Sequence, residues 1–408
     1  MWTVARSPTR YRIANHCERY GHRMVELVIN KSTQLKSIGY SMVMSSETLE
    51  SLVAKWCKRN VLAVDTEFLR TDTYYPIVGL VQVFDGRECH LIDPQAVSIQ
   101  PLAAVLEDAT VLKVFHACSE DLEVFQAEVG AVPTPVFDTQ VAAAMLGEDF
   151  SMSYQRLVER YLNVLVAKEQ TRSDWLQRPL TDEQLDYAAL DVIHLFDVYR
   201  LQVEQLNQQD RHSWVIEECT TDPSEMPTMI DPERYFRRIR GSGSLDGLQL
   251  RRLQQLSAWR ERLARDRDVP RSRIVDDKSL LTICRDDIVD KRLLDKKTKM
   301  THRQIRRYAE EISEQLRLAN EDSDASHPEV MPDPTSTLNN RLIRELKGLV
   351  EEAAQLQRIA PEMLATRRHL EQFLRSGRQG EYQLPAPLAG WRRSVIGDRL
   401  LQHLRNDQ

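Results

Sequence analysis

The sequence predicts an α/β domain with a mixed sheet, followed by two small all-α domains. Short apolar runs typical of strands alternate with helical periodicity between residues 60 and 218. Strand patterns are missing from the remainder of the chain, and two stretches rich in polar residues, proline or glycine interrupt it. These observations predict an N-terminal extension at 1–44, the α/β domain at 45–220, linkers at 221–244 and 320–337, and helical domains at 245–319 and 338–408.

Residues 1–44 are basic and poorly patterned, with seven basic and two acidic side chains. Met42 and Met44 immediately precede Ser45-Ser46-Glu47, which is a good start for a helix running through Trp56. The extension is therefore expected to be a disordered arm or the product of an upstream start codon. Its glutamates and the lack of an amphipathic repeat argue against a transit peptide.

The α/β domain begins with strand signals. Val61–Val64 reads as a buried strand, and Val78–Phe84 and Glu88–Ile92 follow it with the turn signal Asp85-Gly86 between them. Val111–Phe115 is a further short strand. Early antiparallel strands followed by strand–helix units indicate a mixed sheet.

Helical signals follow these strands. Periodicity runs from Ser119, a candidate N-cap, through Glu128, and again from Gln140 through Met145. A long helix is expected after Pro179-Leu180-Thr181, because Thr181 and Gln184 have the spacing of a capping box. The two C-terminal pieces also look faintly alike, which suggests a duplicated helical domain.

The composition is that of a soluble globular protein, with 42% hydrophobic and 28% charged residues in 408. Nothing approaches the roughly 20 apolar residues of a membrane helix, and the N-terminus lacks the apolar core of a secretory signal. The six cysteines are far apart and form no CxxC pair, which favours reduced thiols and a cytoplasmic protein. No membrane partner is expected, and a monomer is the default expectation.

The net charge of −6 conceals a strong asymmetry along the chain. Residues 45–230 carry 13 basic and 31 acidic side chains, whereas residues 231–320 carry 23 and 15. An acidic domain joined to a basic one indicates a metal-using site beside a module that attracts a polyanion, such as nucleic acid. The alternative is that these charges only solvate helix faces.

Asp65 and Glu67 follow the buried Val61–Val64 run at two-residue spacing. On an extended backbone both carboxylates leave the same face, where two like charges need a cation. Oxygen ligands suit a hard ion such as Mg²⁺ or Mn²⁺. Taken alone, the pair also fits a strand end with two solvated acids.

Two further acidic segments strengthen the metal hypothesis. Asp121 is expected in the first turn of the helix that starts at Ser119, where free N–H groups support a negative charge. Tyr187 and Asp191 are at i and i+4, so the phenol and the carboxylate emerge on one helix face. Each segment alone fits an ordinary helix; their occurrence in this order favours a site.

With these residues the chain resembles the DEDD exonucleases of the ribonuclease H-like superfamily. Asp65-Thr66-Glu67 matches the first motif, His116 to Asp121 the second, and Tyr187 to Asp191 the third, with tyrosine marking the tyrosine branch. The surrounding segments are similar to the ribonuclease D family, and both C-terminal pieces resemble HRDC domains, the second more loosely. Those segments are Val81-Gln82-Val83, Phe137-Asp138-Thr139-Gln140, Arg172-Ser173-Asp174-Trp175 and Arg178-Pro179-Leu180.

The resemblance implies a 3′-5′ exoribonuclease that trims RNA precursors such as tRNA and releases nucleoside 5′-monophosphates. Two divalent ions, Mg²⁺ or Mn²⁺, would be held by four carboxylates. Asp65 would bridge both ions, Glu67 and Asp191 would bind the ion that activates water, and Asp121 would hold the second ion largely through water. Tyr187 would orient the attacking water, since a phenol pKa near 10 is high for a base.

Other residues are weaker candidates for RNA contacts. Gln82, His116 and Arg178 are possible substrate contacts, and Trp175, Tyr74 and Tyr75 are possible stacking surfaces for bases. For the three aromatic residues packing is the alternative, and for His116 a structural hydrogen bond. Alternative functions are a single-strand DNA exonuclease, an inactive nucleic-acid-binding protein, and a sugar or nucleotide enzyme, for which no phosphate-binding glycine loop is present.

Overall fold

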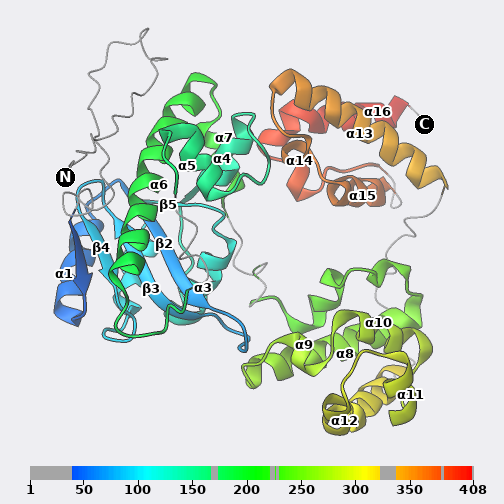
Figure 1. Ribbon diagram of the computed structural model, residues 1–408. Helices are drawn as coiled ribbons and strands as arrows, with labels where there is room; N and C mark the ends of the chain where they lie inside the picture. The colour runs from blue at the N-terminus through cyan, green and yellow to red at the C-terminus, as the bar shows by residue number, and fades with distance from the viewer. Residues whose placement is uncertain are drawn as a thin grey trace, which may run out of the picture.

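The computed structural model describes residues 39–166, 173–220, 226, 229–321, 337–377 and 381–406. Figure 1 shows an α/β domain followed by two separate groups of helices. Most of the expected extension and of the second expected linker, part of the first linker, and Arg172 lie outside the described residues. Among the described residues, none of the helices is long and apolar enough to cross a membrane.

The α/β domain is built on one six-stranded sheet with the order β1-β4-β3-β2-β5-β6. β2 pairs antiparallel with β3 and β3 with β4, whereas the pairs β1–β4, β2–β5 and β5–β6 are parallel. This is the mixed sheet that the sequence predicts. The strands are β1 (Tyr40–Val43), β2 (Val61–Leu69), β3 (Ile77–Phe84), β4 (Cys89–Ile92), β5 (Leu112–Phe115) and β6 (Val136–Asp138).

The edge strand β1 lies inside the segment that we expected to be an extension. Tyr40–Val43 pairs in register with Cys89–Ile92, and Val43 is fully buried. The expected boundary at residue 44 therefore falls after the first strand of the sheet. Four residues give little periodicity, and the partner strand lies almost fifty residues away, so no local pattern indicates this pairing.

Strand β2 is longer than its apolar run suggests. The expected strand ended at Val64, with the two acids after it, but the strand continues to Leu69. The reason is the antiparallel ladder with β3, which pairs Asp65 with Gln82 and continues to the end of β2, with a register irregularity after Glu67. Both acids therefore lie on a hydrogen-bonded strand, which fixes their direction.

Helices of the α/β domain begin close to their expected starts. Ser45 caps α1, where its hydroxyl accepts a hydrogen bond from the Thr48 N–H at 3.3 Å. The expected cap at Ser119 is wrong, because Cys118 is the N-cap and Ser119 is the first helical residue. The helices are α1 (Ser46–Trp56), α2 (Ala103–Leu106), α3 (Ser119–Val129), α4 (Thr139–Met145), α5 (Tyr154–Leu162), α6 (Asp182–Gln208) and α7 (His212–Glu218).

The long helix α6 crosses one face of the sheet (Figure 1). Thr181 and Gln184 form the expected capping box, in which each side chain binds the other residue's backbone N–H. One side of the helix is buried, where Ala188, Ala189 and Val192 are almost fully shielded from solvent. Its small residues allow α6 to lie close against the sheet, and this places Asp191 over β2.

Both C-terminal regions are helical where the structure describes them, as expected. The first contains a 3₁₀ segment (Pro232–Arg238) and α8 (Gly247–Asp266), α9 (Arg271–Ile274), α10 (Asp277–Asp286), α11 (Lys291–Lys297) and α12 (His302–Glu321). The second contains α13 (Thr337–Gln357), α14 (Pro361–Leu364), α15 (Arg367–Ser376) and α16 (Asp398–Asn406).

The loop between β2 and β3 anchors the first helical domain to the α/β domain. Tyr74 is 2% exposed, and its hydroxyl donates a hydrogen bond to Glu261 at 2.5 Å. The backbone N–H groups of Tyr74 and Tyr75 both donate to Asp268 at 2.9 Å. Tyr75 packs beside the hydrophobic core of the first helical domain. Packing, the alternative that the sequence left open for both tyrosines, is thus what the structure shows.

The second helical domain packs against the end of the α/β domain near α7 (Figure 1). The rings of Trp214 and Trp391 stack with their centroids 4.7 Å apart. Beside them the Arg392 guanidinium binds the Glu218 carboxylate at 2.5 and 2.8 Å. One continuous apolar core joins the two domains here, so the second helical domain is an integral part of the fold.

Candidate active site

The structure brings together three of the four carboxylates that the sequence singled out. Asp65 and Glu67 project from β2 and Asp191 from α6, and one carboxylate oxygen of each lies within 4.8 Å of the others. The two-residue spacing on β2 places both acids on the face that α6 covers. Strand β2 and helix α6 therefore place three carboxylates close together.

Asp121 reaches the same region from the N-terminal turn of α3. Its carboxylate accepts a hydrogen bond from the Thr66 hydroxyl at 2.5 Å, and Thr66 lies between the two acids of β2. The Asp65 charge and burial both act on Asp121, and burial is the larger influence. Asp121 is thus adjacent to the group of three but held apart from it by its bond to Thr66.

Burial raises the pKa of every one of these carboxyl groups, and repulsion from neighbouring carboxylates adds to this for Asp65, Glu67 and Asp121. Burial and then the Asp191 charge raise the pKa of Asp65 to about 8. Burial raises the pKa of Asp191 to about 7, and the pKa values of Glu67 and Asp121 also lie well above their usual range. Four acids that resist ionisation together form a site that a positive charge would stabilise.

The donor set fits a divalent cation. Carboxylate oxygens bind Mg²⁺ or Mn²⁺ at roughly 2.0–2.2 Å, so ligands on opposite sides of one ion lie about 4 Å apart. The oxygens of Asp65, Glu67 and Asp191 are within 4.8 Å of one another, which one ion can span with small side-chain adjustments. All three donors are oxygens, which excludes a preference for soft metals.

Tyr187 lies one turn before Asp191 on α6, as expected, and its hydroxyl lies close enough to the Asp191 carboxylate for each group to shift the pKa of the other. Burial, followed by the charges of Asp191 and Glu67, raises the pKa of the Tyr187 phenol above its usual range. The phenol therefore stays protonated at neutral pH. It is a hydrogen-bond donor at the edge of the cluster and cannot serve as a base there.

Tyr154 is a residue of this region that sequence reasoning missed. Its hydroxyl donates a hydrogen bond to the backbone carbonyl of Asp191 at 2.5 Å, from the short helix α5. The carboxylates of Asp191 and Asp65 both act on the phenol, so Tyr154 lies directly behind the cluster. No motif signals this residue, because its role depends on α5 packing across α6.

His116 packs against the ring of Tyr154. Its Nδ1 is 3.0 Å from the Thr139 hydroxyl, and its ring meets the Tyr154 ring edge-on with centroids 5.4 Å apart. Burial lowers the pKa of His116, which keeps the imidazole neutral at pH 7. These contacts correspond to the structural alternative that the sequence left open for His116.

The turn that leads into α3 is held by Asp138. Its carboxylate accepts hydrogen bonds from the N–H groups of Ala117 and Cys118, both at 2.9 Å, and from Gln140. Ala117 has a positive φ of 54°, which costs energy in a residue with a Cβ. The bonds to Asp138 compensate for this and so fix the start of the helix that carries Asp121.

Gln82 lies directly across the ladder from Asp65 and is completely buried. Within the described part of the chain, its amide nitrogen and oxygen have no hydrogen-bond partner. A buried amide without partners is costly, and its location beside the acids leaves both amide atoms available to a bound group. The geometry is compatible with the expected substrate contact.

Trp175 and Arg178 are engaged in contacts within the protein. Trp175 is 3% exposed, and its ring lies 6.2 Å from that of Tyr187. Arg178 binds the Asp93 carboxylate at 2.6 and 2.8 Å and also donates to the carbonyls of Gly79 and Trp175. Both residues thus hold the segment before α6 against the sheet, beneath Tyr187.

Comparisons with known proteins agree with this geometry. Residues 40–206 match a family model described as 3′-5′ exonuclease, residues 249–316 the HRDC domain, and residues 340–400 the ribonuclease D C-terminal HRDC domain. The chain is 40% identical over 354 residues to ribonuclease D of Pseudomonas paraeruginosa, covering 86% of this chain and 94% of that protein. It is 33% identical to ribonuclease D of Escherichia coli, covering 89% and 98%.

A solved structure shows the same architecture. The crystal structure of Escherichia coli RNase D superposes with a TM-score of 0.82 at 31% sequence identity, covering 90% of this chain and 99% of that one. The ribonuclease H-like fold and the acidic cluster together define a hydrolytic 3′-5′ exonuclease. Within that class, the chain belongs to the ribonuclease D family and is an exoribonuclease.

Proposed function

We propose that this exoribonuclease trims the 3′ ends of structured RNA precursors, tRNA among them, with two divalent metal ions held by Asp65, Glu67, Asp121 and Asp191. The observation that carries the proposal is the approach of three carboxylate oxygens to within 4.8 Å of one another. When bound, two such ions lower the pKa of an attacking water and neutralise charge on the phosphoryl group.

The protein's own residues have distinct tasks in this proposal. The Asp191 charge raises the pKa of Asp65, and the Asp65 charge raises the pKa of Asp121. Asp65 therefore lies between the other two carboxylates. Glu67 and Asp191 would hold one ion, and Asp121, whose carboxylate is bound by the Thr66 hydroxyl, would help to hold the second. Tyr187 donates a hydrogen bond that orients the nucleophilic water, and deprotonation is left to the metal site.

Mg²⁺ or Mn²⁺ is the proposed metal. The donors are oxygens alone, and hard divalent cations prefer such ligands. Tightly packed acids with raised pKa values also imply that metal binding displaces protons, so affinity rises with pH through the range in which these groups ionise.

Structured RNA is the proposed substrate for two reasons. The related Escherichia coli enzyme is described as an exoribonuclease involved in structured RNA processing. In this chain the segment 231–320 has an excess of basic residues, which suits a long polyanion better than a short oligonucleotide. We further propose that the protein acts as a monomer in the cytoplasm.

The domain division is also proposed, with one change. We place the catalytic domain at 39–220, so that β1 is included. The helical domains at 245–319 and 338–408 enclose the HRDC matches at 249–316 and 340–400, which supports these limits.

The test uses a tRNA precursor and a single-stranded DNA of matched length, each labelled at its 5′ end. Wild type, Asp65→Asn and the control Glu204→Gln, an exposed acid on α6, are compared with Mg²⁺, with Mn²⁺ and with chelator. We expect a metal-dependent ladder that shortens from the RNA 3′ end, is retained in the control and is absent in Asp65→Asn.

Two outcomes would overturn parts of the proposal. Faster shortening of the DNA than of the RNA would make the single-strand DNA exonuclease the better assignment. Equal activity of Asp65→Asn and wild type would show that the cluster is not the catalytic site.

A further inference from the structure

A pocket lies at the junction between the catalytic domain and the first helical domain. Its volume is about 520 Å³, and it is bordered by Asp72 from the β2–β3 loop and by residues of α9 and α12. Three of the lining side chains are arginines, namely Arg273, Arg303 and Arg307. With Asp72 as the one lining acid among the described residues, the pocket carries a net charge of +2.

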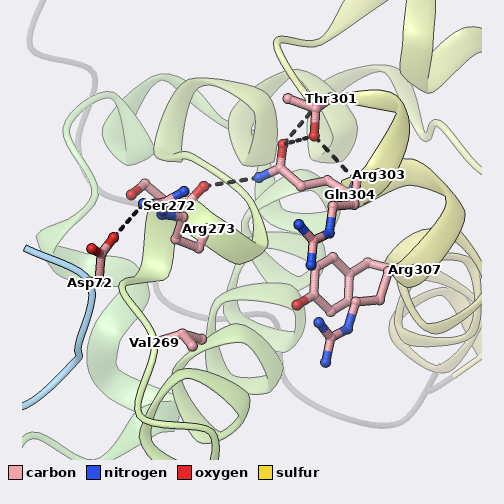
Figure 2. A pocket seen from close by; sticks show the side chains of 9 residues that line it. Asp72, Val269, Ser272, Arg273, Thr301, Arg303, Gln304 and Arg307 are labelled. Carbon is pink, nitrogen blue, oxygen red and sulfur yellow. Dashed lines mark hydrogen bonds and ion pairs between the residues drawn. The ribbon is translucent and has the colours of Figure 1, made fainter.

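The arginines of α12 are free to bind an anion. Arg303 and Arg307 are four positions apart, so they project from one helix face, as Figure 2 shows. Both are exposed, and within the described part of the chain neither has an acidic partner. Arg307 lies over the Tyr308 ring at 5.5 Å, which keeps its guanidinium near the pocket wall.

The third arginine of the pocket forms an ion pair with the catalytic domain. Arg273 of α9 pairs with Asp72, and this pair spans the junction (Figure 2). The side chains are 67% and 74% exposed, so water screens the pair and it holds Arg273 only weakly. An anion that brings more charge than one carboxylate can therefore compete with Asp72 for Arg273.

The Gln304 amide and the Thr301 hydroxyl of the pocket are already engaged. The Gln304 amide donates to the carbonyls of Ser272 and Ile274, and its oxygen accepts bonds from Thr301. The Tyr308 ring is 4% exposed and is not available for stacking. The pocket thus offers positive charge but little with which to read a base, which favours phosphate over a particular nucleotide.

We propose that this junction pocket binds the phosphodiester backbone of RNA, with Arg303 and Arg307 as permanent contacts and Arg273 as a contact that Asp72 restrains. The proposal deepens the assigned activity and rests on the proposed RNA substrate. RNA that extends from the catalytic cluster along the β2–β3 loop would reach this pocket. Binding there is independent of sequence and sensitive to salt.

The arrangement also connects the pocket with the catalytic strand. Asp72 lies five residues after Glu67, in the loop that Tyr74 and Tyr75 fix to the first helical domain. The pocket is therefore held at a constant place relative to β2. A backbone phosphate bound there would fix the distance between the body of the RNA and its 3′ end.

The experiment measures binding of a labelled RNA hairpin with a single-stranded 3′ tail, in chelator, across a range of salt concentrations. The double variant Arg303→Gln/Arg307→Gln is compared with Arg306→Gln/Lys299→Gln, which removes two exposed charges nearby but outside the pocket. We expect the pocket variant to bind about tenfold more weakly, and its log–log salt slope to fall by about 0.7 for each arginine that no longer binds a phosphate.

A second variant is expected to act in the opposite direction. Asp72→Asn releases Arg273 and should bind the hairpin about twofold more tightly, because a weakly held exposed pair is removed. Glu107→Gln, an exposed acid at the C-terminal end of α2, makes the same change in net charge and should leave binding unchanged.

Hydrolysis of a trinucleotide separates this inference from the proposed function. All pocket variants should cleave it at the wild-type rate, since none touches the acidic cluster. If the pocket and control double variants bind the hairpin equally, or if Asp72→Asn matches Glu107→Gln, the pocket does not bind RNA. If wild type itself hydrolyses no RNA, the proposed function fails instead.

Discussion

Asp65→Asn should stabilise the metal-free protein while it abolishes hydrolysis. The pKa of Asp65 rises from its usual 3.8 to about 8 because the group is buried beside Asp191. The folded state therefore binds more protons than the unfolded state between these values, and stability falls as the pH rises through that window. The amide carries no charge and removes this pH-dependent destabilisation.

The magnitude follows from the shift. Each pKa unit corresponds to about 1.4 kcal/mol, so at pH 7 Asp65 titrating alone would destabilise the fold by about 4 kcal/mol. Asp65 keeps some contact with water and shares its protons with Asp191, which leaves about 2 kcal/mol after screening. For a domain of this size that raises Tm by about 4–8 °C.

The assay is thermal unfolding of wild type, Asp65→Asn and the exposed control Glu204→Gln in chelator, from pH 4.5 to pH 8. The gain of Asp65→Asn should be largest at pH 8 and small near pH 4.5, where the carboxyl group is protonated in the folded state and the unfolded state approaches its usual pKa of 3.8. Adding Mn²⁺ at a hundredfold excess over its Kd should stabilise wild type by about 2.7 kcal/mol and the variant much less. Should Asp65→Asn unfold at or below the wild-type temperature at pH 8 without metal, the repulsive cluster inferred from the structure does not exist.

Three further predictions concern the surroundings of the site and the contact of the second helical domain. Tyr154→Phe removes the hydroxyl bound to the Asp191 carbonyl and should weaken Mn²⁺ binding about fivefold by calorimetry, whereas Tyr161→Phe on the same helix should not. Burial lowers the pKa of His194 to about 4, so the free energy of unfolding of wild type should fall by up to about 3 kcal/mol as the pH drops from 6.5 to 4. Denaturant unfolding at a series of pH values should show a weaker pH dependence of this free energy for His194→Gln. Trp391→Ala removes the stack on Trp214 and should destabilise the second helical domain by about 3 kcal/mol, detected as faster proteolysis of that domain; unchanged cleavage would contradict the shared core.

Features that depend on near neighbours in the chain could be predicted from the sequence. Alternation on β2 placed Asp65 and Glu67 on one face, and the i, i+4 spacing on α6 did the same for Tyr187 and Asp191. The capping box at Thr181 and the class of the fold could also be predicted from the sequence. Such features follow from backbone geometry, which has fixed periods of two and 3.6 residues.

Contacts between residues that are far apart in the sequence could not be predicted and are known from the structure. The pairing of Tyr40–Val43 with β4, the bond from Tyr154 to Asp191 and the burial of Tyr74 against Glu261 all join segments far apart in the sequence. Their partners are selected by packing of whole elements, which no local period encodes. The acids of this protein were evident from its sequence, but their approach to one another, and the pKa shifts that follow, arise because α6 packs across β2 and buries the acids together.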